Sequence, residues 1–199
     1  EPGLKRAQKR LLYRIKNALA QNQDVSIRLD VPYHRQEHSL SCEIAVLKMA
    51  LNYYGVSVSE NDLLEKLPFD TKGERSKDNV WGDPNLGFVG NIDGVIPNKG
   101  YGVYEKPIAD LAIDYNRLAE IRSGETLPEI LKEVNEGHPV IVWGTLQSGR
   151  DISWKTKEGK NVKAIYGEHV RLIIGYEGPI NNPKSILLHD PVYGTISMT

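Results

Sequence analysis

The spacing of apolar residues predicts a largely buried helix that begins at Cys42. Between residues 42 and 54 few positions are clearly polar, so little of this helix can face water. Ser41 or Ser39 can cap its start, and Gly55 is placed to end it. The polar stretch before the helix predicts an extended loop.

Apolar periodicity and capping signals predict the other elements of the first half. They are a helix over Leu4–Gln21, a strand over Val25–Val31, a helix from Ser59 to Leu67, a helix over Pro107–Leu118, a short strand over Leu118–Ile121 and a helix from Thr126 to Gly137. Ser59 and Thr126 each open a capping box. The first of these helices has a basic face, which we interpret as its solvated side rather than as a membrane or nucleic-acid contact.

The second half changes from helical to strand periodicity. Strands are predicted at Val140–Leu146, Ile152–Thr156, Val162–Tyr166, His169–Tyr176, Ser185–His189 and Thr195–Met198. A helix-rich first half followed by an antiparallel sheet indicates the α+β class. The chain has no internal repeats or linkers, so we expect one domain over residues 25–199 and an N-terminal helical extension over residues 1–24.

Composition narrows the function classes. The 199 residues are 40% hydrophobic, which suits one domain with a substantial core. The 25 basic and 26 acidic residues nearly cancel, so no global field favours nucleic acid. No apolar run is long enough to span a membrane, and a single cysteine excludes an internal disulfide framework. The start at Glu1 leads us to expect that a signal or anchor was removed. The oligomeric state is left open.

The segment Phe69–Gly102 is the least regular part of the chain, because glycines and prolines interrupt it throughout. A loop of this length inside a compact domain is usually functional. Trp81, Asn85, Phe88 and Asn91 supply aromatic and amide groups suited to a substrate-binding cleft. A surface loop that only covers one edge of the core is an equally good interpretation.

Cys42 is the candidate nucleophile. The first turn of a helix presents free N–H groups and the positive end of the helix dipole, which favour a thiolate over a thiol. The thiolate is the form that attacks a carbonyl carbon. A lone cysteine is also often a small buried apolar residue, so the assignment needs a histidine and a carboxylate elsewhere in the chain.

His169 is the candidate base, since it begins an apolar strand that would fix its direction. If this strand pairs with the next one through the turn at Glu177–Lys184, Asp190 comes back alongside His169 and can orient its ring. The other histidines are His34, His38, His138 and His189. The two that precede Cys42 have no third ligand after them, so we predict no metal site.

Gln36 lies in the loop that leads to Cys42. Its side-chain amide, together with the backbone N–H of Cys42, could donate to a developing oxyanion. One such donor is worth about 3–4 kcal/mol of barrier in well-studied enzymes.

The order Gln, Cys, His, Asp resembles the papain-like cysteine peptidases, and more narrowly the C39-like peptidase family, which includes bacteriocin-processing domains and free-standing bacterial relatives. The residues that carry the resemblance are Leu29–Tyr33, Gln36, Ser41–Ala45, Asn52–Gly55, Trp81–Gly90, Gly137–Val140, Gly167–His169, Gly175, Tyr176, Leu188–Pro191 and Gly194. The resemblance implies a papain-like fold with Cys42 as nucleophile, His169 as base, Asp190 as orienting residue and Gln36 as oxyanion donor.

Further expectations follow from this resemblance. The family implies hydrolysis of peptide bonds in a peptide or protein substrate, without metal or organic cofactor, at the surface of a Gram-positive bacterium or outside it. Two residues depart from the simplest pattern: Glu43 stands where many relatives have glycine and would oppose a thiolate, and Arg171 would oppose an imidazolium.

Two alternative functions remain open. One is a binding module that uses Trp81–Gly90, and the other is a Cys-His-Asp acyltransferase.

Overall fold

The computed structural model describes residues 25–199, apart from the side chains at positions 147 and 148. The predicted helix Leu4–Gln21 and the extension 1–24 lie outside the described residues. The helices are α2 Cys42–Tyr53, α3 Glu60–Lys66, α4 Glu105–Asp114 and α5 Leu127–Asn135. The strands are β1 Ser26–Arg28, β2 Phe69–Thr71, β3 Phe88–Gly90, β4 Gly100–Gly102, β5 Val140–Lys155, β6 Asn161–Glu177, β7 Ser185–Asp190 and β8 Gly194–Met198. The α+β fold class is confirmed.

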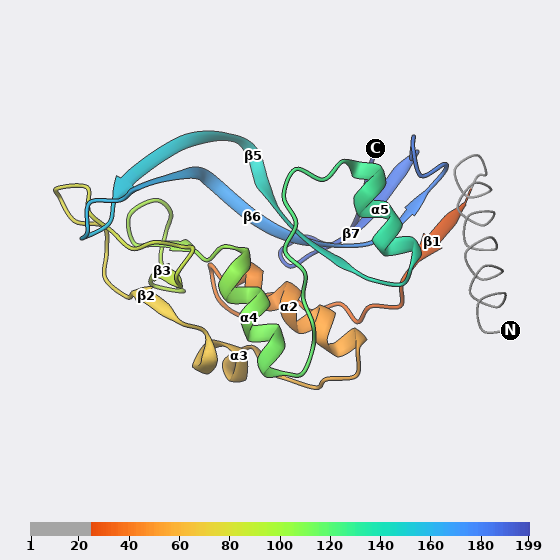
Figure 1. Ribbon diagram of the computed structural model, residues 1–199, viewed down its shortest axis with the longest axis horizontal. Coiled ribbons are helices and arrows are strands. Elements are labelled where there is room, and N and C mark those ends of the chain that lie inside the picture. Colours follow the sequence, from red (N-terminus) through yellow and green to blue (C-terminus); the bar gives the residue numbers. More distant parts are fainter. Residues whose placement is uncertain (1–24) are drawn as a thin grey trace, which may run out of the picture.

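Strand β6 is the centre of the main sheet. It pairs antiparallel with β5 along most of its length, and near its end with β1 and β7, while β8 pairs with β7. The long β5–β6 hairpin curves across the molecule, with α2, α3 and α4 on one side and α5 on the other (Figure 1). A second, smaller sheet is formed by β2, β3 and β4.

Side chains of β6 belong to two separate apolar clusters, one on each face of the sheet. Val170, Leu172 and Ile174 pack with Val46 and Met49 of α2. On the opposite face, Ile173 and Tyr176 pack with Leu131 and Val134 of α5. Side chains alternate along a strand, and an irregularity between Ile173 and Gly175 brings Tyr176 to the same cluster as Ile173. Helices α2 and α5 therefore cover opposite faces of the same sheet. This arrangement presses the start of α2, where Cys42 lies, against β6.

The predicted helix boundaries are largely confirmed. In α3 the Ser59 hydroxyl accepts from the Asp62 N–H at 3.1 Å and the Asp62 carboxylate accepts from the Ser59 N–H at 2.9 Å. The same reciprocal capping box joins Thr126 and Glu129 at the start of α5. Gly55 follows α2 with a φ of +80°, a conformation that favours glycine. Helix α4 is shorter than the predicted Pro107–Leu118.

Two strand predictions are corrected. Four of the predicted strands are parts of two longer strands, β5 and β6. These two strands pair on both sides of a register shift between Thr145 and Arg150, and the pairing keeps both extended there. The predicted strand Leu118–Ile121 does not form. Leu118 is 99% exposed, and the segment has no pairing partner among the described strands.

The irregular segment Phe69–Gly102 folds onto the outer end of the β5–β6 hairpin. Trp81, Val89 and Tyr101 from this segment form one buried cluster with Trp154 of β5 and Val162 of β6. Both tryptophan N–H groups donate to backbone oxygens of the segment, those of Gly73 and Gly82. The segment is therefore a packed part of the core rather than a loose cover.

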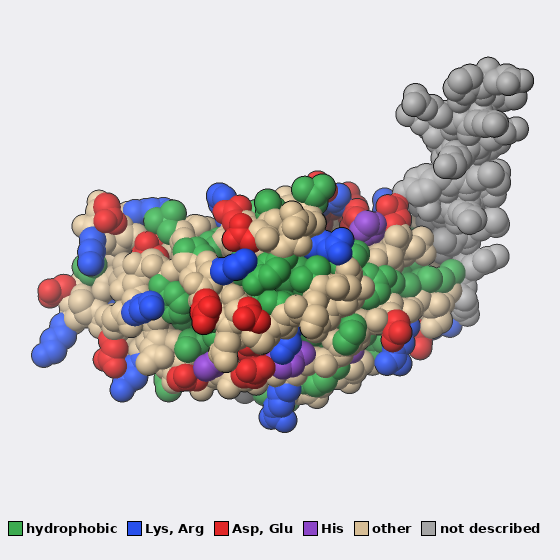
Figure 2. All heavy atoms as spheres, turned by 90° about the horizontal axis from the view of Figure 1, so that it is seen from below, with side chains coloured by type: hydrophobic (Ala, Val, Ile, Leu, Met, Phe, Trp, Pro, Cys, Tyr) green, Lys and Arg blue, Asp and Glu red, His purple; other side chains and the backbone are tan. Residues whose placement is uncertain are grey.

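Charged side chains of both signs are interspersed on the face seen in Figure 2, without a large area of one sign. This agrees with the near balance of acidic and basic residues. Among the described residues, no helix combines the length and hydrophobicity needed to cross a bilayer.

Candidate active site

Cys42 is the first residue of α2, and its exposed fraction is 7%. Ser41 occupies the N-cap position, as predicted, but its side chain does not cap the helix. Instead the Ser41 hydroxyl donates to Glu60 at 2.8 Å and accepts from the backbone N–H of His38 at 3.2 Å. The start of α2 is thus fixed to α3 by a side chain.

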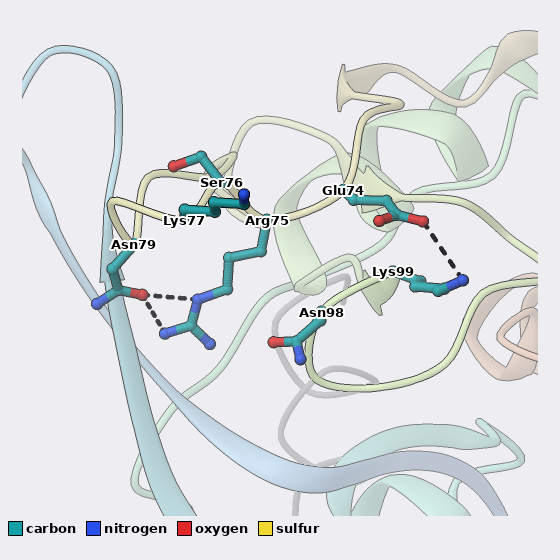
Figure 3. Close-up of a pocket in the computed structure, with 7 residues that line it drawn as sticks. All are labelled: Glu74, Arg75, Ser76, Lys77, Asn79, Asn98 and Lys99. Atoms are coloured by element: carbon teal, nitrogen blue, oxygen red, sulfur yellow. Dashed lines mark hydrogen bonds and ion pairs between the residues drawn. The ribbon is translucent and has the colours of Figure 1, made fainter.

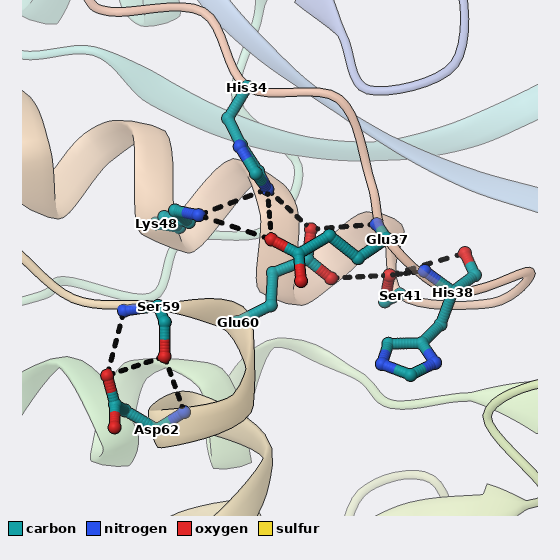
Figure 4. A network of polar contacts seen from close by, with 8 residues as sticks. All are labelled: His34, Glu37, His38, Ser41, Lys48, Ser59, Glu60 and Asp62. Carbon is teal, nitrogen blue, oxygen red and sulfur yellow. Dashed lines mark hydrogen bonds and ion pairs between the residues drawn. The ribbon is translucent and has the colours of Figure 1, made fainter.

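Glu60 organises the loop before Cys42 (Figure 4). Its carboxylate is buried, accepts from the Glu37 backbone N–H at 3.0 Å and contacts His34 Nε2 at 2.8 Å. Lys48 of α2 lies 3.2 Å from the same histidine nitrogen. These contacts hold residues 34–41 against α2 and α3, and so set where the cysteine lies.

The thiol of Cys42 lies among groups from α2 and β6. Its S–H donates to Glu43 Oε2 at 3.3 Å, and the nearby backbone N–H of Val170 acts to lower the pKa of the thiol. A carboxylate oxygen of Glu168 lies within 4.8 Å of both Cys42 Sγ and a Glu43 oxygen. The sulfur therefore contacts β6 at the residues on either side of His169.

The prediction that the helix start would favour a thiolate is wrong for this structure. Burial, followed by the nearby Glu43 and Glu168 carboxyls, raises the pKa of Cys42 well above its usual value. Burial raises the pKa of Glu43 to about 7, although the Val103 N–H donates to it at 2.8 Å. Burial and Glu43 also raise the pKa of Glu168. Glu43 opposes the thiolate, as predicted. The raised pKa values favour the protonated forms of Cys42, Glu43 and Glu168.

We expect Glu43→Gln to make Cys42 more reactive. The amide keeps an acceptor for the Val103 N–H and removes a negative charge beside the sulfur, so the pKa of Cys42 should fall. Iodoacetamide alkylation at pH 8 should become at least severalfold faster, because the thiolate is the reactive form. Glu65→Gln, at an exposed position of α3, is the control. An unchanged or slower rate in Glu43→Gln would contradict the electrostatic explanation.

The same variant should alter how stability depends on pH. The pKa of Glu43 is about 7 in the fold and about 4.5 when unfolded, so folding takes up a proton between these values. The free energy of unfolding then falls as pH rises through this window. Thermal unfolding from pH 4 to 8 should show a smaller decline for Glu43→Gln than for the natural chain.

His169 and Asp190 lie together, as the strand pairing predicts. His169 Nε2 is 3.0 Å from Asp190 Oδ2, and Arg171 Nε donates to the same oxygen at 2.8 Å. Asp190 Oδ1 accepts from the backbone N–H groups of Val192 and Tyr193 at 2.9 and 3.1 Å. A carboxylate held in this way orients the ring and leaves Nδ1 as the nitrogen that Asp190 does not bind.

The protonation of His169 follows from its surroundings. Burial lowers its pKa, the contact with Asp190 raises it, and the charge of Arg171 lowers it, for a net decrease. The predicted opposition between Arg171 and an imidazolium is confirmed in direction. Among the described residues, no hydrogen bond joins the ring of His169 to Cys42 Sγ. The residues on either side of His169 in the sequence, Glu168 and Val170, are the ones that lie near the thiol.

Gln36 does not have a free amide in this structure. Its Nε2 donates to the backbone oxygens of His38 at 2.7 Å and Ser39 at 3.0 Å. Its backbone N–H donates to Pro191 at 3.0 Å, which ties the cysteine loop to the turn after Asp190. The oxyanion role of Gln36 stays a prediction, and it requires the side chain to turn.

The four residues predicted to line a cleft divide into two pairs. Trp81 and Phe88 are 4% and 0% exposed and belong to apolar clusters, so the prediction that they line a substrate cleft is corrected. Asn85 and Asn91 are exposed, and their side chains make local contacts with Asp83 and with the backbone of Asp93. A substrate role for this second pair stays a prediction.

Sequence reasoning missed Glu168. It stands directly before His169 on β6. Val170, two residues further along this strand, packs against α2. The side-chain period of two could have indicated that Glu168 and Val170 share the side that faces Cys42.

A hollow elsewhere in the described structure is lined by residues other than Cys42, His169 and Asp190. It measures about 510 Å³ and is lined by Glu74, Arg75, Ser76, Lys77, Asn79, Asn98 and Lys99. Figure 3 shows two interactions among the lining residues, a hydrogen bond from Arg75 to Asn79 and an ion pair between Lys99 and Glu74. None of these residues contacts the cysteine or the histidine.

Comparison with known proteins agrees with this geometry. A family model described as the Peptidase_C39 like family matches residues 28–198. A crystal structure described as a "putative C39-like peptidase from Bacillus anthracis" matches with a TM-score of 0.73 and 30% identity, and the match covers 88% of each chain. No curated protein matches the chain. The family match includes the segments that carry Cys42, His169 and Asp190.

Proposed function

The chain belongs to the Peptidase_C39 like family, and from this premise we propose that it hydrolyses peptide bonds with Cys42 as nucleophile. His169 is the base and Asp190 orients it. The observation that carries the proposal is the position of the Cys42 sulfur at the first turn of α2, beside the backbone N–H of the residue after His169, while His169 itself lies 3.0 Å from Asp190.

The reaction starts from neutral groups. The raised pKa of Cys42 and the lowered pKa of His169 both favour a thiol beside a neutral imidazole over an ion pair. Substrate binding brings the ring and the sulfur into contact, since small side-chain movements commonly complete a catalytic hydrogen bond. The proton then moves as the sulfur attacks.

Two half-reactions complete the cycle. Cys42 Sγ bonds to the substrate carbonyl carbon while His169 Nδ1 takes the thiol proton, and the imidazolium returns this proton to the leaving amine as the C–N bond breaks. Water then gives a proton to His169 and attacks the thioester carbon, and the proton returns to the released sulfur. The Cys42 backbone N–H and a reoriented Gln36 amide stabilise the oxyanion.

A protein that keeps the fold without turnover is the second candidate. It is favoured by the missing hydrogen bond between Cys42 and His169 and by the two carboxyls that hold the thiol protonated. Such a protein would bind peptides without cleaving them. Location at a bacterial surface stays a prediction.

Peptide cleavage by the purified chain tests the proposal. A mixture of unfolded proteins is incubated with the chain, and new N-termini are identified by mass spectrometry. We expect cleavage that iodoacetamide pretreatment abolishes, because Cys42 is the one thiol in the sequence. Cleavage that survives alkylation would overturn the nucleophile assignment, and binding without cleavage would support the second candidate. Products joined to an added amine would indicate acyl transfer.

A further inference from the structure

Oε1 of Glu168 is shielded from solvent and has no hydrogen-bond partner among the described residues, although the residue as a whole is only partly buried. An unpaired buried carboxyl loses hydration without compensation. A carboxyl oxygen of Glu43 and the sulfur of Cys42 lie within 4.8 Å of a Glu168 carboxyl oxygen. No lysine or arginine among residues 25–199 forms an ion pair with Glu43 or Glu168. The site therefore offers a thiol and two carboxyls, and no cation among the described residues is paired with them.

We propose that Cys42, Glu43 and Glu168 form a binding site for a divalent cation of the zinc type, and that occupation of this site inhibits the peptidase reversibly. The inference goes beyond the proposed function, because it concerns what blocks the thiol rather than what the thiol does. One sulfur and two carboxylate oxygens are ligands that Zn²⁺ accepts, and a fourth position would be left to water.

The distances suit such an ion. A tetrahedral centre with Zn–S of about 2.3 Å and Zn–O of about 2.0 Å places sulfur and oxygen about 3.5 Å apart. Cys42 Sγ and Glu43 Oε2 are 3.3 Å apart. The Glu168 oxygen, within 4.8 Å of both, closes the site by a small rotation of its side chain.

Surrounding contacts also suit a metal-bound thiolate. Glu43 Oε1 accepts from the Val103 N–H at 2.8 Å, which holds this carboxylate and leaves Oε2 directed at the sulfur. The Val170 N–H, which acts to lower the pKa of the thiol, can donate to the sulfur when the thiol proton is lost. The ion replaces the S–H proton, which is released to solvent, and the bound sulfur can no longer attack a carbonyl carbon.

A second cluster of side chains has comparable metal-ligating atoms and can be compared with the proposed site. His34, Glu37 and Glu60 also lie within 4.8 Å of one another. There the ammonium of Lys48 already lies 3.2 Å from His34 Nε2 and 3.5 Å from Glu37 (Figure 4). A cation of the chain fills that site, so we assign it no metal.

Cobalt(II) titration of the full chain tests the proposal without requiring turnover. We expect one equivalent to bind with a thiolate-to-cobalt absorption band that Zn²⁺ displaces. Cys42→Ser should abolish the band, and Glu168→Gln should weaken binding at least about tenfold, since even outer-shell changes cost that much. His138→Asn, which removes an exposed imidazole just before β5, should leave the titration unchanged. No band, or equal affinity in Glu168→Gln, overturns the proposal.

Protection of the natural chain gives a measurement that does not depend on the folding of a variant. Zn²⁺ should slow iodoacetamide alkylation of Cys42 at least tenfold, and EDTA should restore the rate. Unprotected alkylation at saturating Zn²⁺ would contradict metal binding at the sulfur. Because neither readout uses peptide cleavage, a failed metal site leaves the peptidase proposal standing, and a chain without peptidase activity leaves the metal site testable.

Discussion

Cys42→Ala is expected to abolish peptide hydrolysis and to leave the fold intact. Without the sulfur no thioester can form, and loss of a nucleophile in a comparable catalytic unit costs about 10⁶-fold in kcat. The side chain is small and lies at the first residue of α2, so its truncation should cost only about 1 kcal/mol of stability. Cleavage of a fluorogenic peptide and circular dichroism measure the two effects.

Ser39→Ala is the matched control for this variant, because Ser39 lies in the same loop and is exposed. It should retain cleavage close to that of the natural chain. Residual activity of Cys42→Ala above about one part in 10³ would show that the sulfur is not the nucleophile.

His169→Gln is expected to lower kcat by about 10³-fold or more, since general base catalysis contributes about 10²–10⁴-fold. Asp190→Asn should give a smaller loss, about 10²-fold, because the ring remains but loses the carboxylate that Nε2 and Arg171 share. Both effects should lie in kcat rather than in KM. The pH profile of any remaining activity should also change, which a purely structural role would not cause.

His189→Gln is the control for His169. It is equally buried, at 3% exposed, and it bonds to the Val31 backbone and to Thr195 rather than to the candidate site. Its loss should affect stability and spare kcat. If His189→Gln lowers kcat as strongly as His169→Gln does, the assignment of the base is wrong.

Local signals made much of the fold predictable. The capping boxes at Ser59 and Thr126 act within a few residues, so they fix the starts of α3 and α5 from the sequence alone. The length of the β5–β6 hairpin was not predictable, because the extended conformation near Gly149 depends on pairing with residues far along the chain. Trp81 and Phe88 were wrongly predicted to line a cleft, because the burial of side chains in an irregular segment depends on tertiary contacts.

The candidate site was predictable where it follows from strand pairing. His169 and Asp190 lie on adjacent antiparallel strands joined by a short turn, so their contact follows from the pattern. The protonation of Cys42 was not predictable, because it depends on burial and on Glu168, which approaches from a distant strand. A helix dipole acts weakly beside two buried carboxyls.

Trapping of the acyl-enzyme tests the central claim most directly. The natural chain is mixed with a peptide ester or amide, quenched in acid within the first turnover and analysed by intact-mass and peptide mass spectrometry. The account predicts one acyl group on Cys42, removed by hydroxylamine as expected for a thioester and absent from Cys42→Ala. Efficient turnover with no adduct on Cys42, or an adduct on another residue, would contradict it.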